Sequence, residues 1–420
     1  MNVEIITIGD ELLIGQVVDT NSAWMGKELN KIGFDVVRKI TIGDEREELL
    51  TAFNQAFSRV DVVLVTGGIG PTKDDITKKT LCEFFGTDMV FDESVLRNIE
   101  SIFNPRNIHI NELTRDQAFV PRDCTVIQNL TGTAPITWFE RGDKVLVSMP
   151  GVPFEMKNVM TREILPRLLN KYAKDIHILH RTFSVKNYGE SALALHIADW
   201  ENNLPEFIRL AYLPSPGIVR LRLTGRLSNL DQLEKALDNA EKQLLPLLGE
   251  DIFALSEAPV GEFLGNLLKE KSLTLAVAES CTGGYIAHQI TSVAGSSVYF
   301  LGGIVSYSNA MKHSVLGVSD IDLEQFGAVS REVALQMVEG VIRITGADVA
   351  IATTGIAGPD GGSPDKPVGT VWIAIKVNDE VKVEKFRFGN VREANIVRSA
   401  NQAMLMAAEM IQSQTNRITD

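Results

Sequence analysis

Residues 60–75 read VDVVLVTGGIGPTKDD, a nearly continuous apolar run that opens into glycines and ends in two aspartates. A run so rich in β-branched residues predicts a strand covered on both faces, as in a parallel sheet. Similar apolar runs stand at residues 3–9 (VEIITIG), 34–42 (FDVVRKITI) and 144–151 (KVLVSMPG), and a helical segment carries Met25, Leu29 and Ile32 on one face. This alternation predicts an α/β domain over residues 1–170, with a parallel sheet that binds ligands where strand ends meet loops.

The pattern changes after about residue 170. Residues 218–226, IVRLRLTGR, alternate apolar and polar side chains, and leucines at helical spacing follow at positions 230, 233, 237 and 244. These features predict a small α+β domain over residues 171–256. From residue 257 the alternation of strands and helices returns, with apolar runs at 273–278, 348–355 and 369–377, and it predicts a second α/β domain over residues 257–420.

The composition is that of a globular protein, with 420 residues, 45% of them hydrophobic and 23% charged. There is no apolar run of about eighteen residues, and the N-terminal MNVEIITIGDE carries acids where a secretory signal carries lysines, so we expect a cytoplasmic protein without membrane association. The three cysteines, Cys82, Cys124 and Cys281, are far apart and odd in number, which favours reduced thiols. A net charge of −13 disfavours direct contact with nucleic acid.

The first candidate site is the loop 66–75, TGGIGPTKDD. Its glycines let backbone N–H groups approach an anion, and the helix that follows adds its N-terminal dipole. Asp74 and Asp75 are suited to hold a hard cation such as magnesium that bridges to a phosphate. Asp10 and Glu155 follow other strands and are expected at the same sheet edge. A tight turn with helix-capping aspartates is the alternative.

The second candidate site begins with AESCTGGYIAHQI at residues 278–290. Ser280, Cys281 and Thr282 stand between an apolar strand and a helix, where hydroxyls and free N–H groups collect an anion. Helix capping by a hydroxyl is the alternative. Cys281 is a second candidate nucleophile, although a small buried thiol is the favoured interpretation.

The segment 294–318 adds a possible catalytic set of Ser297, Tyr307 and Lys312. A partly desolvated lysine, sometimes relayed through a tyrosine, can take the proton of a serine hydroxyl. The alternative is a capping serine, a core tyrosine and a solvated lysine. The loop TTGIAGPDGG at 353–362 supplies donors for an oxyanion or a sugar phosphate, and Arg398 could pair with the phosphate bidentately.

Taken together these motifs resemble one family. GDELLIGQVVDTNS (9–22), TGGIGPTKDD (66–75) and MPGVPFEM (149–156) resemble the N-terminal domain of the CinA family, which is similar in fold to molybdopterin-binding domains. ESCTGG (279–284), AGSS (294–297), YSN (307–309), TGIAGPDGG (354–362) and KPVGTVW (366–372) resemble the C-terminal nicotinamide-nucleotide amidase domain of the same family.

The C-terminal resemblance implies hydrolysis of nicotinamide mononucleotide to nicotinate mononucleotide and ammonia, with no cofactor. It implies that Ser297 attacks the amide carbon while Tyr307 and Lys312 handle protons. The residues that it implies for substrate binding are Ser280, Thr282, Gly283, Thr354, Gly355 and Arg398.

The N-terminal resemblance implies binding of a nucleotide diphosphate and ADP-ribose pyrophosphatase activity. The implied nucleotide-binding residues are Asn21, Gly67, Gly68, Gly70 and Thr72, and the implied ligands of a divalent cation, magnesium first with potassium as an additional ion, are Asp10, Asp74, Asp75 and Glu155. The alternatives are a pyrophosphatase with an inactive C-terminal domain, a molybdopterin- or nucleotide-binding protein, and a competence-related interaction protein. The expected partners are small nucleotides and a second copy of the chain, as a homodimer.

Overall fold

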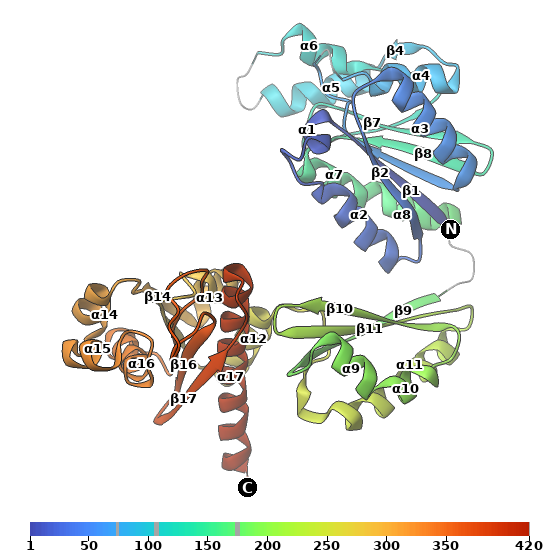
Figure 1. Cartoon of the computed structure of the whole chain (residues 1–420). Helices are drawn as coiled ribbons and strands as arrows, with labels where there is room; N and C mark the ends of the chain where they lie inside the picture. Colours follow the sequence, from blue (N-terminus) through green and yellow to red (C-terminus); the bar gives the residue numbers. More distant parts are fainter. Residues whose placement is uncertain (73–74, 105–108, 173–176, 420) are drawn as a thin grey trace. The chain divides into compact units, whose positions relative to one another are not determined.

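The computed structural model describes residues 1–72, 75–104, 109–172 and 177–419. The chain divides into two compact units, Met1–His180 with Gly225–Glu234, and Arg181–Thr224 with Lys235–Asp420 (Figure 1). In the described part of the chain, no helix is both long and apolar enough to cross a bilayer.

The first unit is built on a six-stranded sheet with the order β2-β1-β3-β8-β7-β6. Its first four strands are parallel, and the last two are antiparallel additions at one edge. A separate two-stranded ladder joins β4 and β5. The bounds are β1 Asn2–Ile8, β2 Asp35–Ile42, β3 Val62–Thr66, β4 Met89–Phe91, β5 Phe119–Pro121, β6 Thr125–Ile127, β7 Ile136–Arg141 and β8 Lys144–Met149.

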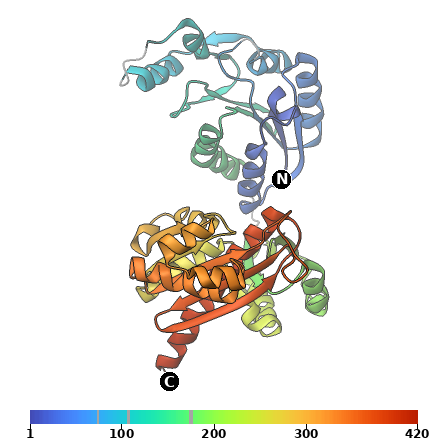
Figure 2. The same ribbon diagram turned by 60° about the vertical axis from the view of Figure 1, so that its left-hand side comes forward.

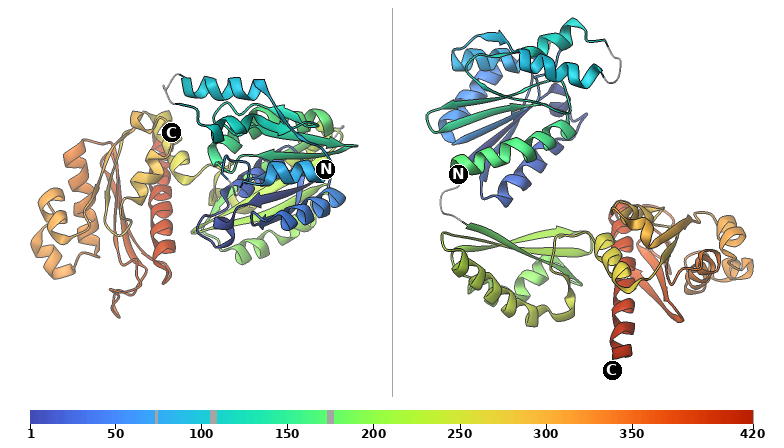
Figure 3. Two further views of the ribbon diagram at one scale, coloured as in Figure 1. Left: turned by 90° about the horizontal axis from the view of Figure 1, so that it is seen from above. Right: turned by 180° about the vertical axis from the view of Figure 1, so that it is seen from behind.

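Helices cover both faces of this sheet (Figure 3). Along β3, Leu64 packs in one core with Met25 of α2, whereas Val65 packs in another with Phe53 of α3. The β-branched run is therefore buried on both sides, as predicted. The helices are α1 Asp10–Leu13, α2 Thr20–Lys31, α3 Arg46–Arg59, α4 Thr77–Phe85, α5 Glu93–Phe103, α6 Glu112–Arg115, α7 Pro153–Val159 and α8 Leu165–Tyr172.

A four-stranded sheet with the order β10-β11-β9-β12 follows along the chain, and its β12 pairs antiparallel with β9. Its strands are β9 His177–Lys186, β10 Ile208–Ser215, β11 Ile218–Leu227 and β12 Ile252–Ala254, and its helices are α9 Glu190–His196, α10 Ala198–Asn202 and α11 Leu230–Leu248. Of the four leucines at helical spacing, Leu233, Leu237 and Leu244 are fully buried, whereas Leu230 at the start of α11 is 40% exposed. An antiparallel strand pair together with these helices agrees with the predicted α+β class of this segment.

The remaining sheet has the order β14-β13-β15-β16-β17. Its first three strands are parallel, so their carboxyl ends meet at one edge, and the last two are antiparallel. The bounds are β13 Leu275–Glu279, β14 Phe300–Val305, β15 Val349–Gly355, β16 Thr370–Val377 and β17 Glu380–Arg387. The predicted α/β class is confirmed here as well as in the first unit.

This sheet is also covered on both faces (Figures 1 and 3). One face packs against α12 Val260–Lys271, α13 Tyr285–Thr291 and the long C-terminal α17 Arg392–Thr419, which extends past the sheet in Figure 2. The other packs against α14 Asn309–Leu316, α15 Asp320–Phe326 and α16 Arg331–Thr345. That second face is an alanine layer formed by Ala276, Ala278, Ala350, Ala352 and Ala374.

Candidate active site

Three buried hydroxyl side chains belong to the carboxyl ends of β13, β14 and β15. Ser280 directly follows β13, Ser306 directly follows β14, and Thr353 stands near the end of β15. Ser280 N–H donates to the Thr353 carbonyl at 2.9 Å, and Ser306 N–H donates to the Glu279 carbonyl at 2.8 Å. Parallel pairing therefore gathers at one sheet edge groups that are far apart in sequence, where α/β proteins form their sites.

Lys312 reaches this edge from the first turns of α14. Its ammonium donates to Ser280 Oγ at 2.9 Å and to the Ser306 carbonyl at 2.8 Å, and the residue is only 1% exposed. Burial lowers the pKa of Lys312, because desolvation disfavours the charged form. Among the residues that the structure describes, no carboxylate forms an ion pair with Lys312 to offset that effect. A lysine in this environment is suited to accept a proton from the serine that it touches.

The N–H groups at the start of α13 are not free to bind an anion. The carboxylate of Glu279 accepts N–H groups from Gly284, Ile286 and Ala287 at 2.8 to 3.1 Å. Sequence reasoning passed over Glu279 as the last residue of a strand, and its burial at 1% exposure is what distinguishes it. The expectation of an anion site at this helix start is corrected, since the protein's own carboxylate occupies it.

Cys281 does not have the environment of a nucleophilic thiol. It is buried, and burial raises its pKa to about 12. Because the thiolate is the reactive form, such a cysteine is inert at neutral pH. The interpretation as a small buried thiol is supported by this geometry.

The predicted set of Ser297, Tyr307 and Lys312 is not joined through its side chains, although the Lys312 ammonium donates to the Tyr307 backbone carbonyl at 3.5 Å. Ser297 is exposed on a short 3-10 turn, and its side chain forms no hydrogen bond with any residue in the described ranges. Tyr307 is 60% exposed, and its hydroxyl accepts an N–H of Arg392 at 2.9 Å. Lys312 instead contacts Ser280, a residue that the sequence suggested first for substrate binding and, after Ser297, as a nucleophile. The sequence alone does not show which serine hydroxyl, that of Ser280 or that of Ser297, lies beside the lysine.

The other predicted substrate-binding residues divide into two groups. Thr282 Oγ1 lies 2.7 Å from Thr353 Oγ1 near Ser280, and Gly283 N–H donates to the Ser280 carbonyl at 3.1 Å. Thr354 points elsewhere, because its hydroxyl donates to the Ala328 carbonyl at 2.7 Å. Gly355 is the last residue of β15, paired with Val371 of β16.

Two arginines of α17 lie near loops of this domain. Arg392 lies near the loop that follows β15, and Arg398 lies near the turn that precedes α17. Arg392 donates to the Gly358 carbonyl at 2.7 Å as well as to Tyr307, and sequence reasoning missed it. Arg398 is half-buried beside Gly389, and its guanidinium forms no hydrogen bond or ion pair within the described part of the chain. Arg398 is therefore available to bind an anion.

In the first unit, the predicted phosphate loop is closed by its own aspartate. Asp75 accepts the N–H groups of Gly70 at 2.7 Å and Thr72 at 2.9 Å, and the hydroxyl of Thr72 as well. Gly67 and Gly68 have positive φ angles of 109° and 63°, and a Cβ on Gly67 would lie 2.2 Å from the Ile8 carbonyl oxygen. Only glycine, which has no Cβ, fits so close to the Ile8 carbonyl.

The predicted cation ligands are not gathered into one group. Glu155 accepts from Asn129 at 2.6 Å, Asp10 lies beside Gly43, and Asp75 is bound to its own loop. Asp74 lies outside the described residues. Within the described ranges, no three His, Cys, Asp or Glu side chains are arranged to hold a metal ion, and the cation site that includes Asp74 stays a prediction.

Asn21 has a structural contact in addition to its predicted role. Its amide donates to the Gly151 carbonyl at 2.7 Å and to Thr66 Oγ1 at 3.3 Å, which joins α2 to the ends of β3 and β8. Its side-chain oxygen is buried and has no hydrogen-bond partner in the described structure. That oxygen is the side-chain atom of Asn21 that is left for a ligand.

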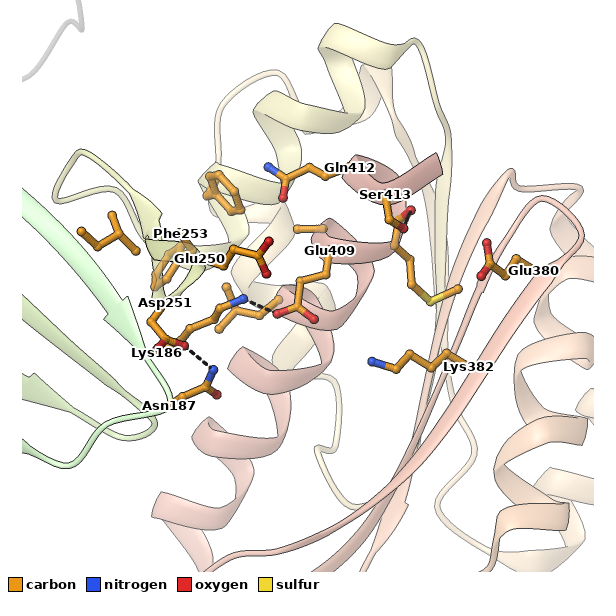
Figure 4. A pocket seen from close by; sticks show the side chains of 15 residues that line it. Lys186, Asn187, Glu250, Asp251, Phe253, Glu380, Lys382, Glu409, Gln412 and Ser413 are labelled. Atoms are coloured by element: carbon orange, nitrogen blue, oxygen red, sulfur yellow. Dashed lines mark hydrogen bonds and ion pairs between the residues drawn. The ribbon is translucent and has the colours of Figure 1, made fainter. Parts of the chain in front are cut away.

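A cavity of about 760 Å³ lies apart from these residues, in the second unit (Figure 4). It is lined by α17, β17 and the segment around β12, and none of the predicted site residues lines it. Its polar groups are partly paired with one another, Lys186 with Glu409 and Asn187 with Asp251. Its size alone does not make it the active site.

Comparisons with known proteins cover nearly the whole chain. Three family models match, described as a probable molybdopterin binding domain (residues 4–170), the damage-inducible protein CinA KH domain (180–254) and the CinA C-terminal domain (257–411). A CinA-like protein of Flavobacterium psychrophilum is 45% identical over 408 residues, 97% of each chain, and one of Cytophaga hutchinsonii is 44% identical over 393 residues, 94% of each. A crystal structure of a competence/damage inducible protein from Agrobacterium tumefaciens is 40% identical over 36% of this chain and 93% of its own, with a TM-score of 0.35.

Proposed function

The chain belongs to the CinA family, as its motifs indicated, and on that premise we propose that its C-terminal part hydrolyses nicotinamide mononucleotide to nicotinate mononucleotide and ammonia. The observation that carries the proposal is the contact of 2.9 Å between the Lys312 amine and the Ser280 hydroxyl. A buried serine in hydrogen-bond contact with a buried lysine has the arrangement expected of a nucleophile and its base, and this supports the proposal.

In the proposed reaction Ser280, rather than the predicted Ser297, is the nucleophile. Neutral Lys312 takes the Ser280 proton as Oγ bonds to the carboxamide carbon, and the carbonyl electron pair moves onto the amide oxygen. When that pair returns, the C–N bond breaks and the amine leaves with the proton from Lys312 as ammonia. Water then attacks the ester on Ser280, gives a proton to the serine oxygen by way of Lys312, and releases the carboxylate.

Substrate recognition is assigned to the arginines of α17. Nicotinamide mononucleotide carries a phosphate, and a guanidinium pairs with phosphate through two parallel hydrogen bonds. Arg398 has its donors available, whereas Arg392 is held by Tyr307 and the Gly358 carbonyl. We therefore assign the phosphate to Arg398 first, and to Arg392 the role of fixing Tyr307 and the loop after β15.

The test is ammonia release from nicotinamide mononucleotide in the presence of a chelator, comparing wild type, Ser280→Ala and Ser297→Ala. We expect release to be lost in Ser280→Ala and retained in Ser297→Ala. The reverse pattern would return the nucleophile to Ser297. Absence of release from wild type would sink the amidase proposal itself.

A second candidate function belongs to the first unit. The family resemblance implies binding of a nucleotide diphosphate and pyrophosphatase activity on ADP-ribose, and the unpartnered side-chain oxygen of Asn21 is available to such a ligand. The dependence on a divalent cation stays a prediction, because its proposed ligand Asp74 lies outside the described residues. Hydrolysis of ADP-ribose measured with magnesium and with a chelator tests this candidate, and turnover that is absent in both would leave a binding role.

We further propose that the chain acts as a homodimer without direct nucleic-acid contact. The net charge of −13 supports the second part, because nonspecific affinity for nucleic acid comes from basic side chains that displace counterions. Sedimentation tests the dimer. Tight, salt-sensitive retention of DNA on a filter would overturn the expectation for nucleic acid.

A further inference from the structure

The turn that carries Ser280 is held from inside by a buried carboxylate. Glu279 Oε2 accepts the N–H groups of Gly284 at 3.0 Å and Ile286 at 3.1 Å, and Oε1 accepts that of Ala287 at 2.8 Å. The first N–H groups of a helix have no partner within the helix, so a carboxylate there both satisfies them and complements the helix dipole. Three bonds from one side chain fix the turn to the start of α13.

The same turn leaves two other N–H groups without a backbone acceptor in the described ranges. Ser280 itself is fixed, since its N–H donates to Thr353 and its carbonyl accepts from Gly283. In the described part of the chain, the Thr282 N–H donates to no acceptor, and the Cys281 N–H meets only the sulfur of its own side chain. They directly follow Ser280, and in many acyl-transfer enzymes the N–H after the nucleophile binds the oxyanion.

We propose that Glu279 is a positioning residue for the amidase reaction. Its carboxylate holds the turn 280–284 so that Ser280 Oγ stays beside Lys312 while the N–H groups of Cys281 and Thr282 bind the oxyanion. The proposal rests on the proposed function of Ser280 as nucleophile. As Ser280 Oγ bonds to the amide carbon, the carbonyl electron pair becomes an oxyanion facing these two donors, and it returns when the amine leaves.

A carboxylate is needed at position 279 because the three groups that it contacts are all N–H donors. Glutamine at position 279 has nearly the same size but only one acceptor oxygen, and its NH₂ group would face at least one of the three N–H donors. The turn would then have to shift. A displacement of about 1 Å of catalytic groups costs about 100-fold in rate, and loss of one oxyanion donor costs about the same or more.

The experiment compares Glu279→Gln with Glu4→Gln in the full chain. Glu4 is a matched control, because it is a fully buried carboxylate in the first unit, paired with Arg59 at 3.1 Å, and it has no part in either proposed site. Two readouts are used: the rate of labelling of Ser280 by a fluorophosphonate, located by mass spectrometry, and kcat and KM for nicotinamide mononucleotide. Thermal unfolding reports the stability of each variant.

We expect Glu279→Gln to be labelled about 100-fold more slowly and to lose about 100-fold in kcat with KM little changed, while Glu4→Gln loses only stability. If Glu279→Gln is labelled slowly but wild type does not turn over nicotinamide mononucleotide, the positioning role of Glu279 is supported and nicotinamide mononucleotide is refuted as the substrate. If Glu279→Gln is less stable than wild type but is labelled at the same rate as wild type, the proposal is overturned. Failure of wild-type Ser280 to be labelled at all would overturn both the proposal and the nucleophile on which it rests.

Discussion

Lys78 of α4 provides a test of the electrostatics of the first unit. It is only 7% exposed, and its ammonium donates to Gln117 Oε1 at 3.0 Å, with the Gln117 and Phe119 carbonyls at 3.4 Å. Burial lowers the pKa of Lys78 from 10.5 to about 8, and the negative charges of Asp75 and Asp116 offset only part of that effect. The folded protein therefore holds this proton less tightly than the unfolded chain does.

The sign and size of the effect follow from proton linkage. Between the folded and unfolded pKa values the unfolded chain binds more protons, so stability is lowest below pH 8 and increases as pH rises toward 10.5. From pH 7 to pH 10 this one group should add about 2.5 kcal/mol to the free energy of unfolding. Lys78→Met has no such proton, so the difference in stability between wild type and the variant should change by that amount over the same range.

The assay is urea unfolding followed by tryptophan fluorescence from pH 7 to pH 10. Trp200 and Trp372 are replaced by phenylalanine in the parent, so that only Trp24 and Trp138, both in the first unit, report the transition. Lys79→Met removes an exposed lysine from the next position and controls for the change in net charge. A difference between wild type and Lys78→Met that stays constant across this pH range would refute the reasoning.

The remaining predictions concern the second unit. Lys312→Met should lower kcat for nicotinamide mononucleotide by roughly 100- to 10,000-fold in steady-state assays, and Lys312→Arg should not restore it, because a guanidinium stays protonated. In wild type, kcat/KM should rise with pH as Lys312 loses its proton, with a midpoint below the ordinary lysine value of 10.5 because burial lowers its pKa; a pH-independent profile would contradict this. Cys281→Ala should keep its activity, and the native thiol should resist iodoacetamide near neutral pH, because its pKa is about 12; inactivation by alkylation at this residue would reopen the thiol alternative. Arg398→Ala should raise KM with less effect on kcat, since it is assigned to phosphate binding, and an unchanged KM would remove it from the site.

The fold could be predicted because its signals are local. The β-branched run of β3 needs apolar cover on both faces, and the structure packs Leu64 and Val65 into opposite cores. In the same way, leucines at helical spacing predicted the buried face of α11. Such patterns depend on residues close together in sequence, so a reader of the sequence has all the information that is needed.

The candidate active site could be predicted only in part because its contacts join distant segments. Lys312 stood out as a base candidate, but its partner Ser280 is brought to it by the strand order β14-β13-β15, which no spacing along the chain reveals. Glu279 and Asp75 were harder still. The sequence suggested that the N–H groups of these two loops bind a ligand. In the folded structure, the carboxylate of Glu279 or Asp75 already accepts hydrogen bonds from them.

The alanine layer of the C-terminal sheet bears on how this protein can diverge over evolutionary time. Because α16 lies close against these small side chains, each added methylene would push the helix outward. α14 packs on α16 so closely that a Cβ on Gly340 would lie 2.1 Å from the Leu316 carbonyl oxygen, and Lys312 would move with it. Descendants can vary the exposed side of α16 with little consequence. A substitution of a larger residue for an alanine of this layer should persist only when a residue of α16 that packs against it has become smaller.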